Sequence, residues 1–314
     1  MSKSLLTLTV NPALDRIVTV DRLVFEDRAY IESTTEAAGG RGINAARVLT
    51  TFGAAVTAVT TSGGETGRKF DEHLQDDQFT KEIVKVRNSI RTNLTISDRQ
   101  GLSVKLNERG PALSQLEQGR IIKAVEKLLP NCSWALLCGS LPPNVDARLY
   151  TKLIELAAKH KVETLLDTDG DALLYGLEAK PTIVKPNQSE AERLLNTALI
   201  TRSQLIEAVQ RIKAMGPASV VLSLGSRGVI AATSTEGILE VIPPAVEALC
   251  PIGAGDAMSA AIVWALDRQQ PFSEALRWGV AAGTASSKLP GITLANLEQS
   301  KEIYPQTQIT RIVV

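Results

Sequence analysis

Short apolar runs alternate along most of the chain with segments whose apolar residues recur at the spacing of an α-helix. Several runs, such as WALLCGS at residues 134–140, are continuously apolar, which is typical of strands buried on both faces of a parallel sheet. Strands are predicted at residues 5–10, 54–61, 134–140, 162–168, 182–187 and 219–225, and helices at 115–129, 148–160 and 202–215. The alternation indicates an α/β fold that is doubly wound, with a mostly parallel central sheet flanked by helices.

Two segments break this alternation. Residues 15–38 and 90–108 show the period-two pattern of strands with turn signals between them, and neither has a helical period. They are predicted to pair as a small β-sheet lid over the main sheet. Because no repeat, low-complexity tract or linker divides the chain, we expect one domain over residues 1–314 with the lid inserted into it.

The balance of charge limits the kinds of function that the chain can have. Lys+Arg and Asp+Glu are equal at 34 each, which argues against a general binder of nucleic acid or membrane surfaces. Cys132, Cys138 and Cys250 form no C-x-x-C pair, so neither a disulfide framework nor a zinc site is indicated, and a reducing cytoplasm is expected. With only His73 and His160 present, a catalytic base is more readily sought among the carboxylates.

Glycine-rich loops are the candidate binding elements. In GGRGINAARVL (39–49), glycines run into a helix whose first N–H groups suit an anion, although a tight turn would also need them. Arg41 and Asn44 favour binding. The loops at 61–70 and 223–228 are predicted to be a turn and a hairpin, and the first lacks the G-x-G-x-x-G spacing of a dinucleotide site.

Asp256 is the one ionisable residue between Cys250 and Asp267. It follows Gly253, Ala254 and Gly255 at the start of a predicted helix, where successive N–H groups suit an anion or a developing negative charge. Taken alone, Asp256 is as readily explained as a helix N-cap.

The stretch KPNQSE (185–190) also has two interpretations. Asn187 and Glu190 have the spacing of a capping box. They are also polar groups of the kind found near a hydrated magnesium ion.

Seven motifs in order resemble the phosphofructokinase-B family of ribokinase-like carbohydrate kinases, in particular its branch that phosphorylates sugar phosphates. They are NPALD (11–15), GGRGINAARVL (39–49), GSLPP (139–143), LDTDGDAL (166–173), VKPNQSE (184–190), SLGSRG (223–228) and GAGD (253–256). The resemblance spans residues 5 to 290. It implies a ribokinase-like fold and ATP-dependent phosphorylation of a ketohexose phosphate, fructose 1-phosphate or fructose 6-phosphate first, with tagatose 6-phosphate as the alternative.

The same resemblance implies roles for individual residues. Asp256 would be the general base, and the N–H groups of Gly253, Ala254 and Gly255 would stabilise charge on the transferred phosphoryl group. Sugar-phosphate contacts are expected from Asp15, Arg28, Gly39, Gly40, Arg41, Asn44, Arg91, Asn93, Lys105 and Ser140. ATP contacts are expected from Lys185, Asn187, Ser223, Gly225 and Gly228, and Mg²⁺ would be organised through water by Asn187 and Glu190. The lid is expected to form a homodimer.

The chain departs from the family at two places in these motifs. Arg41 stands where the family usually has lysine, and Cys250-Pro251-Ile252 replaces the usual Thr- or Ser-containing lead into GAGD. These departures raise a second hypothesis, a sugar-phosphate- or nucleotide-binding regulator that has lost catalysis. A third hypothesis, a dinucleotide-dependent oxidoreductase, fails on the glycine spacing at 61–70.

Overall fold

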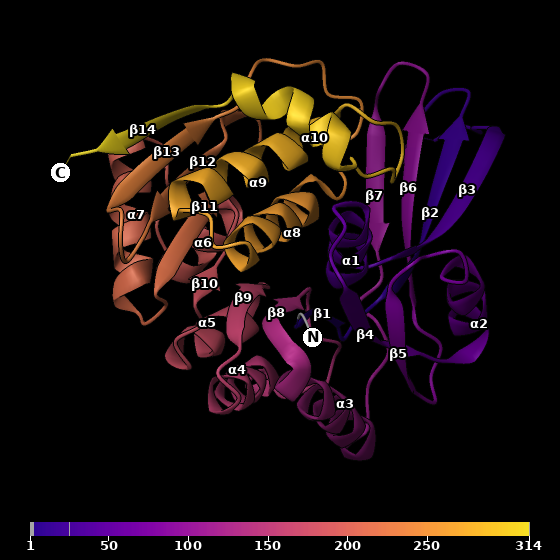
Figure 1. The fold of residues 1–314 in the computed structure, drawn as a ribbon. Coiled ribbons are helices and arrows are strands. Elements are labelled where there is room, and N and C mark those ends of the chain that lie inside the picture. Colours follow the sequence, from indigo (N-terminus) through magenta and orange to yellow (C-terminus); the bar gives the residue numbers. More distant parts are fainter. Residues whose placement is uncertain (1–2, 25, 314) are drawn as a thin grey trace.

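The computed structural model describes residues 3–24 and 26–313, which form two β-sheets and the helices that cover the larger one (Figure 1). The larger sheet has ten strands in the order β14-β13-β12-β11-β10-β9-β8-β1-β4-β5. Its parallel part consists of β1 (Ser4–Thr9), β4 (Val56–Ser62), β5 (Thr80–Lys85), β8 (Cys132–Cys138), β9 (Glu163–Asp167), β10 (Ile183–Val184) and β11 (Ser219–Ser223). β12 (Val229–Ala232), β13 (Ile238–Ile242) and β14 (Gln308–Ile312) extend it antiparallel. The predicted mostly parallel α/β fold is confirmed.

Helices cover both faces of this sheet. One face is packed by α1 (Arg41–Thr51), α8 (Ala254–Asp267) and α9 (Phe272–Ser287). The other is packed by α3 (Gln115–Leu128), α4 (Leu149–Lys159), α5 (Gly170–Glu178), α6 (Gln188–Leu195) and α7 (Arg202–Ala214). Leu5 and Leu6, neighbours in β1, belong to the two different cores, which explains why the parallel strands are continuously apolar.

Strand boundaries differ most from the sequence prediction at β10. The predicted strand at 182–187 has only Ile183 and Val184 in the sheet, because Pro181 and Pro186 on either side have no N–H to donate to a neighbouring strand. The strands β5, β13 and β14 were not predicted, and the reason is the same for two of them, β5 and β14. Both lie at sheet edges and contain many polar residues, so their sequences lack the apolar pattern of a buried strand.

The smaller sheet has four strands in the order β3-β2-β6-β7 and stands beside α1 and the end of the main sheet (Figure 1). It contains β2 (Ala13–Val20), β3 (Ile31–Gly39), β6 (Arg91–Asp98) and β7 (Ser103–Asn107), which come from the two segments that lack a helical period. Phe25, within the first segment, lies outside the described residues. In the register of the sheet, Asp15 pairs with Ala37 on β3 and Asn93 on β6, so these residues point to the same face.

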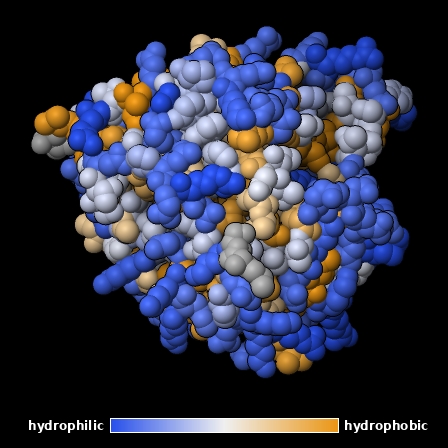
Figure 2. Space-filling model, in the orientation of Figure 1, coloured by the Kyte–Doolittle hydropathy of each residue, from blue (hydrophilic) through white to orange (hydrophobic). Residues whose placement is uncertain are grey.

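The remaining helices complete the layers. These are α2 (Gly64–His73), which contacts β2 and β3, and α10 (Leu297–Ile303), which packs on α9. Within residues 3–24 and 26–313, no helix is long and apolar enough to cross a membrane. The face of the molecule seen in Figure 2 is largely hydrophilic, with apolar side chains in small groups.

Candidate active site

Two cavities meet at the N-terminus of α8. The smaller, of about 260 Å³, lies between the carboxyl ends of the main-sheet strands and the small sheet, and Gly253 and Asp256 line it. The larger, of about 670 Å³, lies on the other side of the same helix end and is lined by Ala254 and Gly255. The first turn of α8 therefore separates two cavities, as a site for group transfer between two bound molecules requires.

The first turn of α8 leaves backbone donors available. Gly253 occupies the N-cap position with φ 78°, a left-handed conformation that favours glycine. Ala254 donates its N–H to the carbonyl of Pro251 at 3.3 Å, whereas the N–H groups of Gly253 and Gly255 have no backbone partner in the described part of the chain. The donors for an anion are thus mainly those of the two glycines.

Asp256 is not a helix cap. The N-cap of α8 is Gly253, and no side chain caps the helix, so the capping interpretation of Asp256 is wrong. Asp256 instead points into the smaller cavity and accepts a hydrogen bond from Asn44 Nδ2 at 2.8 Å. Burial, together with repulsion from Asp167, raises its pKa to about 7, although Asn44 and nearby cations oppose the shift. A carboxyl that ionises near neutral pH is suited to accept a proton.

The small sheet contributes a second carboxylate. Asp15 accepts a hydrogen bond from Asn93 Nδ2 at 2.8 Å, and burial raises the pKa of Asp15. Gly39 is required beside it, because a Cβ there would lie 1.9 Å from Asp15 Oδ2. Gly40 is the N-cap of α1 with φ 133°, which allows the chain to turn from β3 into that helix.

Arg91 is the cation best placed to receive an anionic group. It lines the smaller cavity, and its guanidinium is held by the carbonyl oxygens of Asn11 and Glu108, each at 3.2 Å. Burial, followed by repulsion from Arg41, lowers the pKa of Arg91, and Asp15 opposes that shift. Bonds to carbonyls fix the orientation of Arg91 without neutralising its charge.

The other predicted sugar contacts are distributed unevenly. Arg41, Asn44, Asn93 and Ser140 line the smaller cavity, and Ser140 receives a hydrogen bond from Asn11 at 3.3 Å. Exposed Lys105 lines an adjoining cavity of about 230 Å³.

Arg28 is not brought to the site. It lies exposed between β2 and β3, at the end of the small sheet opposite the cavity. Its backbone N–H binds the neighbouring Asp27.

Four of the five predicted nucleotide contacts line the larger cavity: Asn187, Ser223, Gly225 and Gly228. Lys185 does not. Its ammonium is buried and forms an ion pair with Asp167 at 2.9 Å. A Cβ on Gly255 would lie 3.7 Å from Lys185 Nζ, so this cation supports the start of α8 from below.

Asn187 and Glu190 form the capping box that the sequence also allowed. Asn187 Oδ1 accepts from the N–H of Glu190 at 2.9 Å, and Glu190 Oε2 accepts from the N–H of Asn187 at 2.8 Å. Glu190 Oε1 receives Arg41 Nη2 at 3.1 Å. Within residues 3–24 and 26–313, no group of three or more His, Cys, Asp or Glu side chains is arranged to hold a metal ion. The described residues therefore do not by themselves offer an ion three such ligands.

Sequence reasoning missed a buried carboxylate below the site. Asp167, at the end of β9, contacts Arg41 Nη1 at 2.8 Å, Lys185 at 2.9 Å and Ser259 Oγ at 2.9 Å. Burial would raise its pKa, but Lys185 and Arg41 outweigh that effect and the pKa is lowered. The signal was present: an acidic residue ends a buried strand in LDTDGD, at the sheet edge where ligands of parallel sheets bind.

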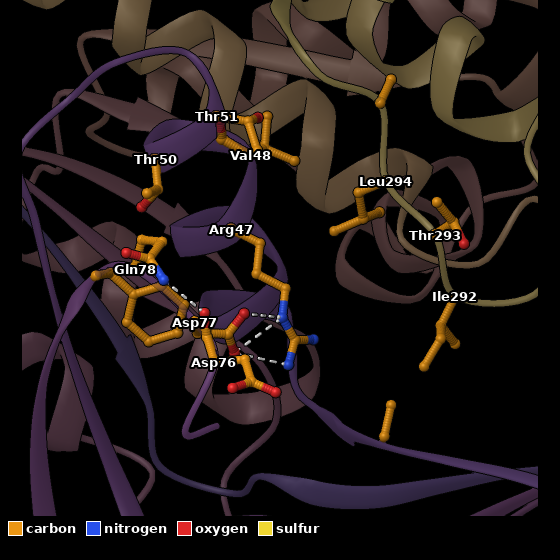
Figure 3. Close-up of a pocket in the computed structure, with 13 residues that line it drawn as sticks. Arg47, Val48, Thr50, Thr51, Asp76, Asp77, Gln78, Ile292, Thr293 and Leu294 are labelled. Carbon is orange, nitrogen blue, oxygen red and sulfur yellow. Dashed lines mark hydrogen bonds and ion pairs between the residues drawn. The ribbon is translucent and has the colours of Figure 1, made fainter. Parts of the chain in front are cut away.

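Other glycines and cavities have structural explanations. The segment at 61–70, predicted to be a turn, is instead the end of β4 followed by the start of α2, and Gly64 in that helix packs on Ser89, whose Oγ would lie 1.9 Å from an added Cβ. A cavity of about 400 Å³ lies along the C-terminal half of α1 (Figure 3). There the guanidinium of Arg47 forms an ion pair with Asp77 at 2.9 Å and a hydrogen bond to the carbonyl of Ala38 at 2.7 Å. Asp77 therefore already neutralises the charge of Arg47.

Comparisons with known proteins agree over nearly the whole chain. A family profile described as "pfkB family carbohydrate kinase" matches residues 9–299. ATP-dependent 6-phosphofructokinase isozyme 2 of Escherichia coli is 32% identical over 303 residues, 95% of this chain and 97% of that protein. The 1-phosphofructokinase of Rhodobacter capsulatus is 31% identical over 283 residues, 90% and 89% of the two chains. The crystal structure of phosphofructokinase-2 from Escherichia coli in complex with potassium has a TM-score of 0.90 at 30% identity, covering 96% of this chain and 98% of that one.

The raised pKa of Asp256 predicts that this residue destabilises the fold at neutral and higher pH. The pKa of about 7 in the folded state lies above the ordinary aspartate value of 3.8, so the folded state binds the proton more tightly, and stability falls as pH rises from about 4 to about 7. Asp256→Asn removes this cost, and we expect it to raise the free energy of unfolding by about 2–4 kcal/mol at pH 8 and by less than half of that near pH 5.

Thermal unfolding of both proteins across pH 5–8 measures this effect. Glu155→Gln, which alters an exposed carboxylate on α4, should leave the melting temperature unchanged at every pH. If Asp256→Asn is less stable than the parent at pH 8, the carboxylate is not destabilising and the raised pKa is contradicted.

Proposed function

The chain belongs to the pfkB family of carbohydrate kinases, and on that premise we propose that it transfers the γ-phosphoryl group of ATP to a hydroxyl of fructose 6-phosphate or fructose 1-phosphate, giving the bisphosphate. The observation that carries the proposal is the position of Asp256 between a small polar cavity and a larger one, at a helix N-terminus with free donors. The relatives named as 6-phosphofructokinase and 1-phosphofructokinase support a fructose phosphate as acceptor.

In the proposed reaction the sugar phosphate occupies the smaller cavity and ATP the larger one. Asp256 accepts the proton of the attacking hydroxyl, whose oxygen forms the bond to the γ-phosphorus as the bond to ADP breaks. The N–H groups of Gly253 and Gly255 and the positive end of α8 stabilise negative charge on the transferred group. Asn44 orients the Asp256 carboxylate through its hydrogen bond of 2.8 Å.

The two substrates use different residues. The proposed contacts to sugar hydroxyls are Asp15, Gly39, Gly40, Asn93 and Ser140. The phosphate that the sugar already carries is proposed to be bound by Arg91, and by Lys105 from the adjoining cavity. The proposed contacts to ATP are Asn187, Ser223, Gly225 and Gly228. Lys185, buried beneath Gly255 at the start of α8, is proposed to support the part of the site that binds the phosphates. Mg²⁺ is proposed to bind together with the phosphates of ATP, and Asn187 and Glu190 would organise its water ligands. Three free cysteines suit a reducing compartment such as the cytoplasm.

A coupled assay of ADP release tests the activity, with fructose 6-phosphate, fructose 1-phosphate, tagatose 6-phosphate, fructose and ribose as acceptors. We expect turnover on a ketohexose phosphate, with kcat/KM rising with pH to a plateau and an apparent pKa near 7, because Asp256 acts only when ionised. Asp256→Asn should lower kcat by about 10²–10⁴-fold while ATP still binds. Absence of turnover on every acceptor, or an Asp256→Asn variant of full activity, would exclude this mechanism.

The position of Arg91 predicts a selective effect on the sugar phosphate. Arg91→Ala removes the cation that is fixed by two carbonyls in the smaller cavity. Its KM for the sugar phosphate should rise about 10–100-fold, the loss of a charged hydrogen bond, while its KM for ATP changes less than about threefold. Arg99→Ala, at the other end of β6 and paired with Glu32, should change neither constant. Equal increases in both KM values for Arg91→Ala would rule out a phosphate contact.

We also propose that the chain forms a homodimer through the small sheet. On the face turned away from the cavity, Leu94 pairs with Leu106, and Ile96 pairs with Val104. Leu106 is 53% exposed and Val104 37% exposed, so this face presents apolar side chains to solvent.

Sedimentation velocity at micromolar concentration tests the dimer. We expect the parent to sediment as a dimer and Leu106→Asp as a monomer, because a buried charge disrupts an apolar interface. Ile200→Asp, at a 79% exposed site between α6 and α7, provides the control and should remain dimeric. If Leu106→Asp is still a dimer, the interface does not lie on this face of the small sheet.

A further inference from the structure

The side chain of Asn11 joins the two sheets at the wall of the smaller cavity. Asn11 lies in the link from β1 of the main sheet to β2 of the small sheet, lines that cavity and is only 3% exposed. Its Nδ2 donates to the carbonyl of Arg109 at 3.0 Å and to Ser140 Oγ at 3.3 Å. Arg109 follows β7 of the small sheet, and Ser140 follows β8 of the main sheet. One amide nitrogen is therefore bonded to the ends of strands from both sheets.

The oxygen of the same amide makes no bond. Asn11 Oδ1 is buried and has no hydrogen-bond partner in the described part of the chain. Gly110 packs directly on it, because a Cβ at Gly110 would lie 2.2 Å from Asn11 Oδ1. Burying an acceptor without a donor is unfavourable. The amide at this position is therefore explained by the two bonds of its nitrogen rather than by a gain in stability.

The segments that Asn11 joins are also the ones that hold Arg91. Nε of Arg91 donates to the carbonyl of Asn11, and its Nη1 donates to the carbonyl of Glu108, the residue before Arg109. Glu108 is bound to β6, the strand of Arg91, because its Oε2 accepts the N–H of Thr92 at 2.8 Å. The bond from Asn11 to Arg109 therefore fixes how far the carbonyl of Asn11 lies from the other carbonyl that orients Arg91.

The orientation of Arg91 decides which way its remaining donors point. Of the five N–H groups of a guanidinium, the two carbonyls use two and leave the other three for a ligand. The group is planar and rigid, so a turn of the guanidinium redirects all three together. A phosphate is bound well only when these donors face its oxygens.

We propose that Asn11 is a positioning residue, whose amide ties the edge of the small sheet that carries Arg91 to the end of the main sheet and so sets how tightly the phosphate of the acceptor is held. Asn11 acts through Arg91 and takes no part in the proton transfer to Asp256. The inference rests on the proposed function for the identity of the ligand, a ketohexose phosphate.

A double-mutant cycle of Asn11→Ala with Arg91→Ala tests this role on the sugar phosphate that is turned over. Asn11→Ala alone should raise the KM for that sugar phosphate about 5–20-fold, while kcat and the KM for ATP change less than about threefold. In the Arg91→Ala background, Asn11→Ala should raise the same KM less than about twofold further, because the group that it positions is gone. A residue that only stabilised the fold would give the same factor in both backgrounds.

Asn88→Ala is the matched control. Asn88 Nδ2 donates to the carbonyl of Ala112 at 3.1 Å, so this variant also removes an amide bond to the segment that follows β7. Asn88 is exposed and does not line the smaller cavity. We expect Asn88→Ala to leave kcat and both KM values unchanged.

Calorimetric titration without ATP separates this inference from the proposed function. Fructose 6-phosphate, fructose 1-phosphate and tagatose 6-phosphate are titrated into the parent and the variants of the cycle. If the parent binds one of them without turnover, the kinase proposal fails and the Kd values complete the same cycle.

The inference is overturned if Asn11→Ala raises the KM or Kd for the sugar phosphate less than about twofold, or by equal factors with and without Arg91. A parent that binds none of the three sugar phosphates overturns both the inference and the proposed function. Should Asn11→Ala fail to fold, Asn11→Ser, whose hydroxyl is too short to reach both acceptors, takes its place in the cycle.

Discussion

The buried carboxylate of Asp167 is the interaction on which the catalytic end of this molecule depends. Through bonds of 2.8–2.9 Å it holds Arg41 of α1, Lys185 after β10 and Ser259 of α8. It therefore sets how the two helices that contribute Asn44 and Asp256 meet above the sheet. Its negative charge also raises the pKa of Asp256, so the same group that fixes the geometry adjusts the chemistry.

The burial of two carboxylates at the catalytic end lowers the stability of the fold there. Two carboxylates, Asp167 and Asp256, share one buried region, and the cations Arg41 and Lys185 lie closer to Asp167 than to Asp256. Asp167 consequently remains ionised, with a lowered pKa, whereas Asp256 ionises near neutrality. Two identical side chains in one site thus acquire different roles through the placement of their partners.

The sequence predicted the parallel core well, since strands buried on both faces are recognisable as continuous apolar runs. It failed where local pattern and tertiary context disagree, as in β10 between two prolines and in the polar edge strands β5 and β14. Asp256 illustrates the same limit: its local pattern favours a cap, and its actual setting depends on Asn44, 212 residues away. The Arg41–Asp167 pair spans 126 residues, so the presence of Arg41 in its motif did not reveal what it binds.

The two sheets carry residues with different proposed roles. Asp15, Arg91 and Asn93 belong to paired strands of the small sheet, where Asp15 is opposite Asn93 and Ala13 is opposite Arg91. Any displacement of that sheet must therefore carry these three residues together, because register fixes their spacing, whereas Gly40 and Ser140 lie outside it. Asp256 and its donors belong to α8 on the main sheet and do not move with them. It follows that substitutions in the small sheet act mainly on substrate binding, whereas substitutions around Asp167 act on the chemical step. Binding and the chemical step are coupled only through the distance between the two sheets.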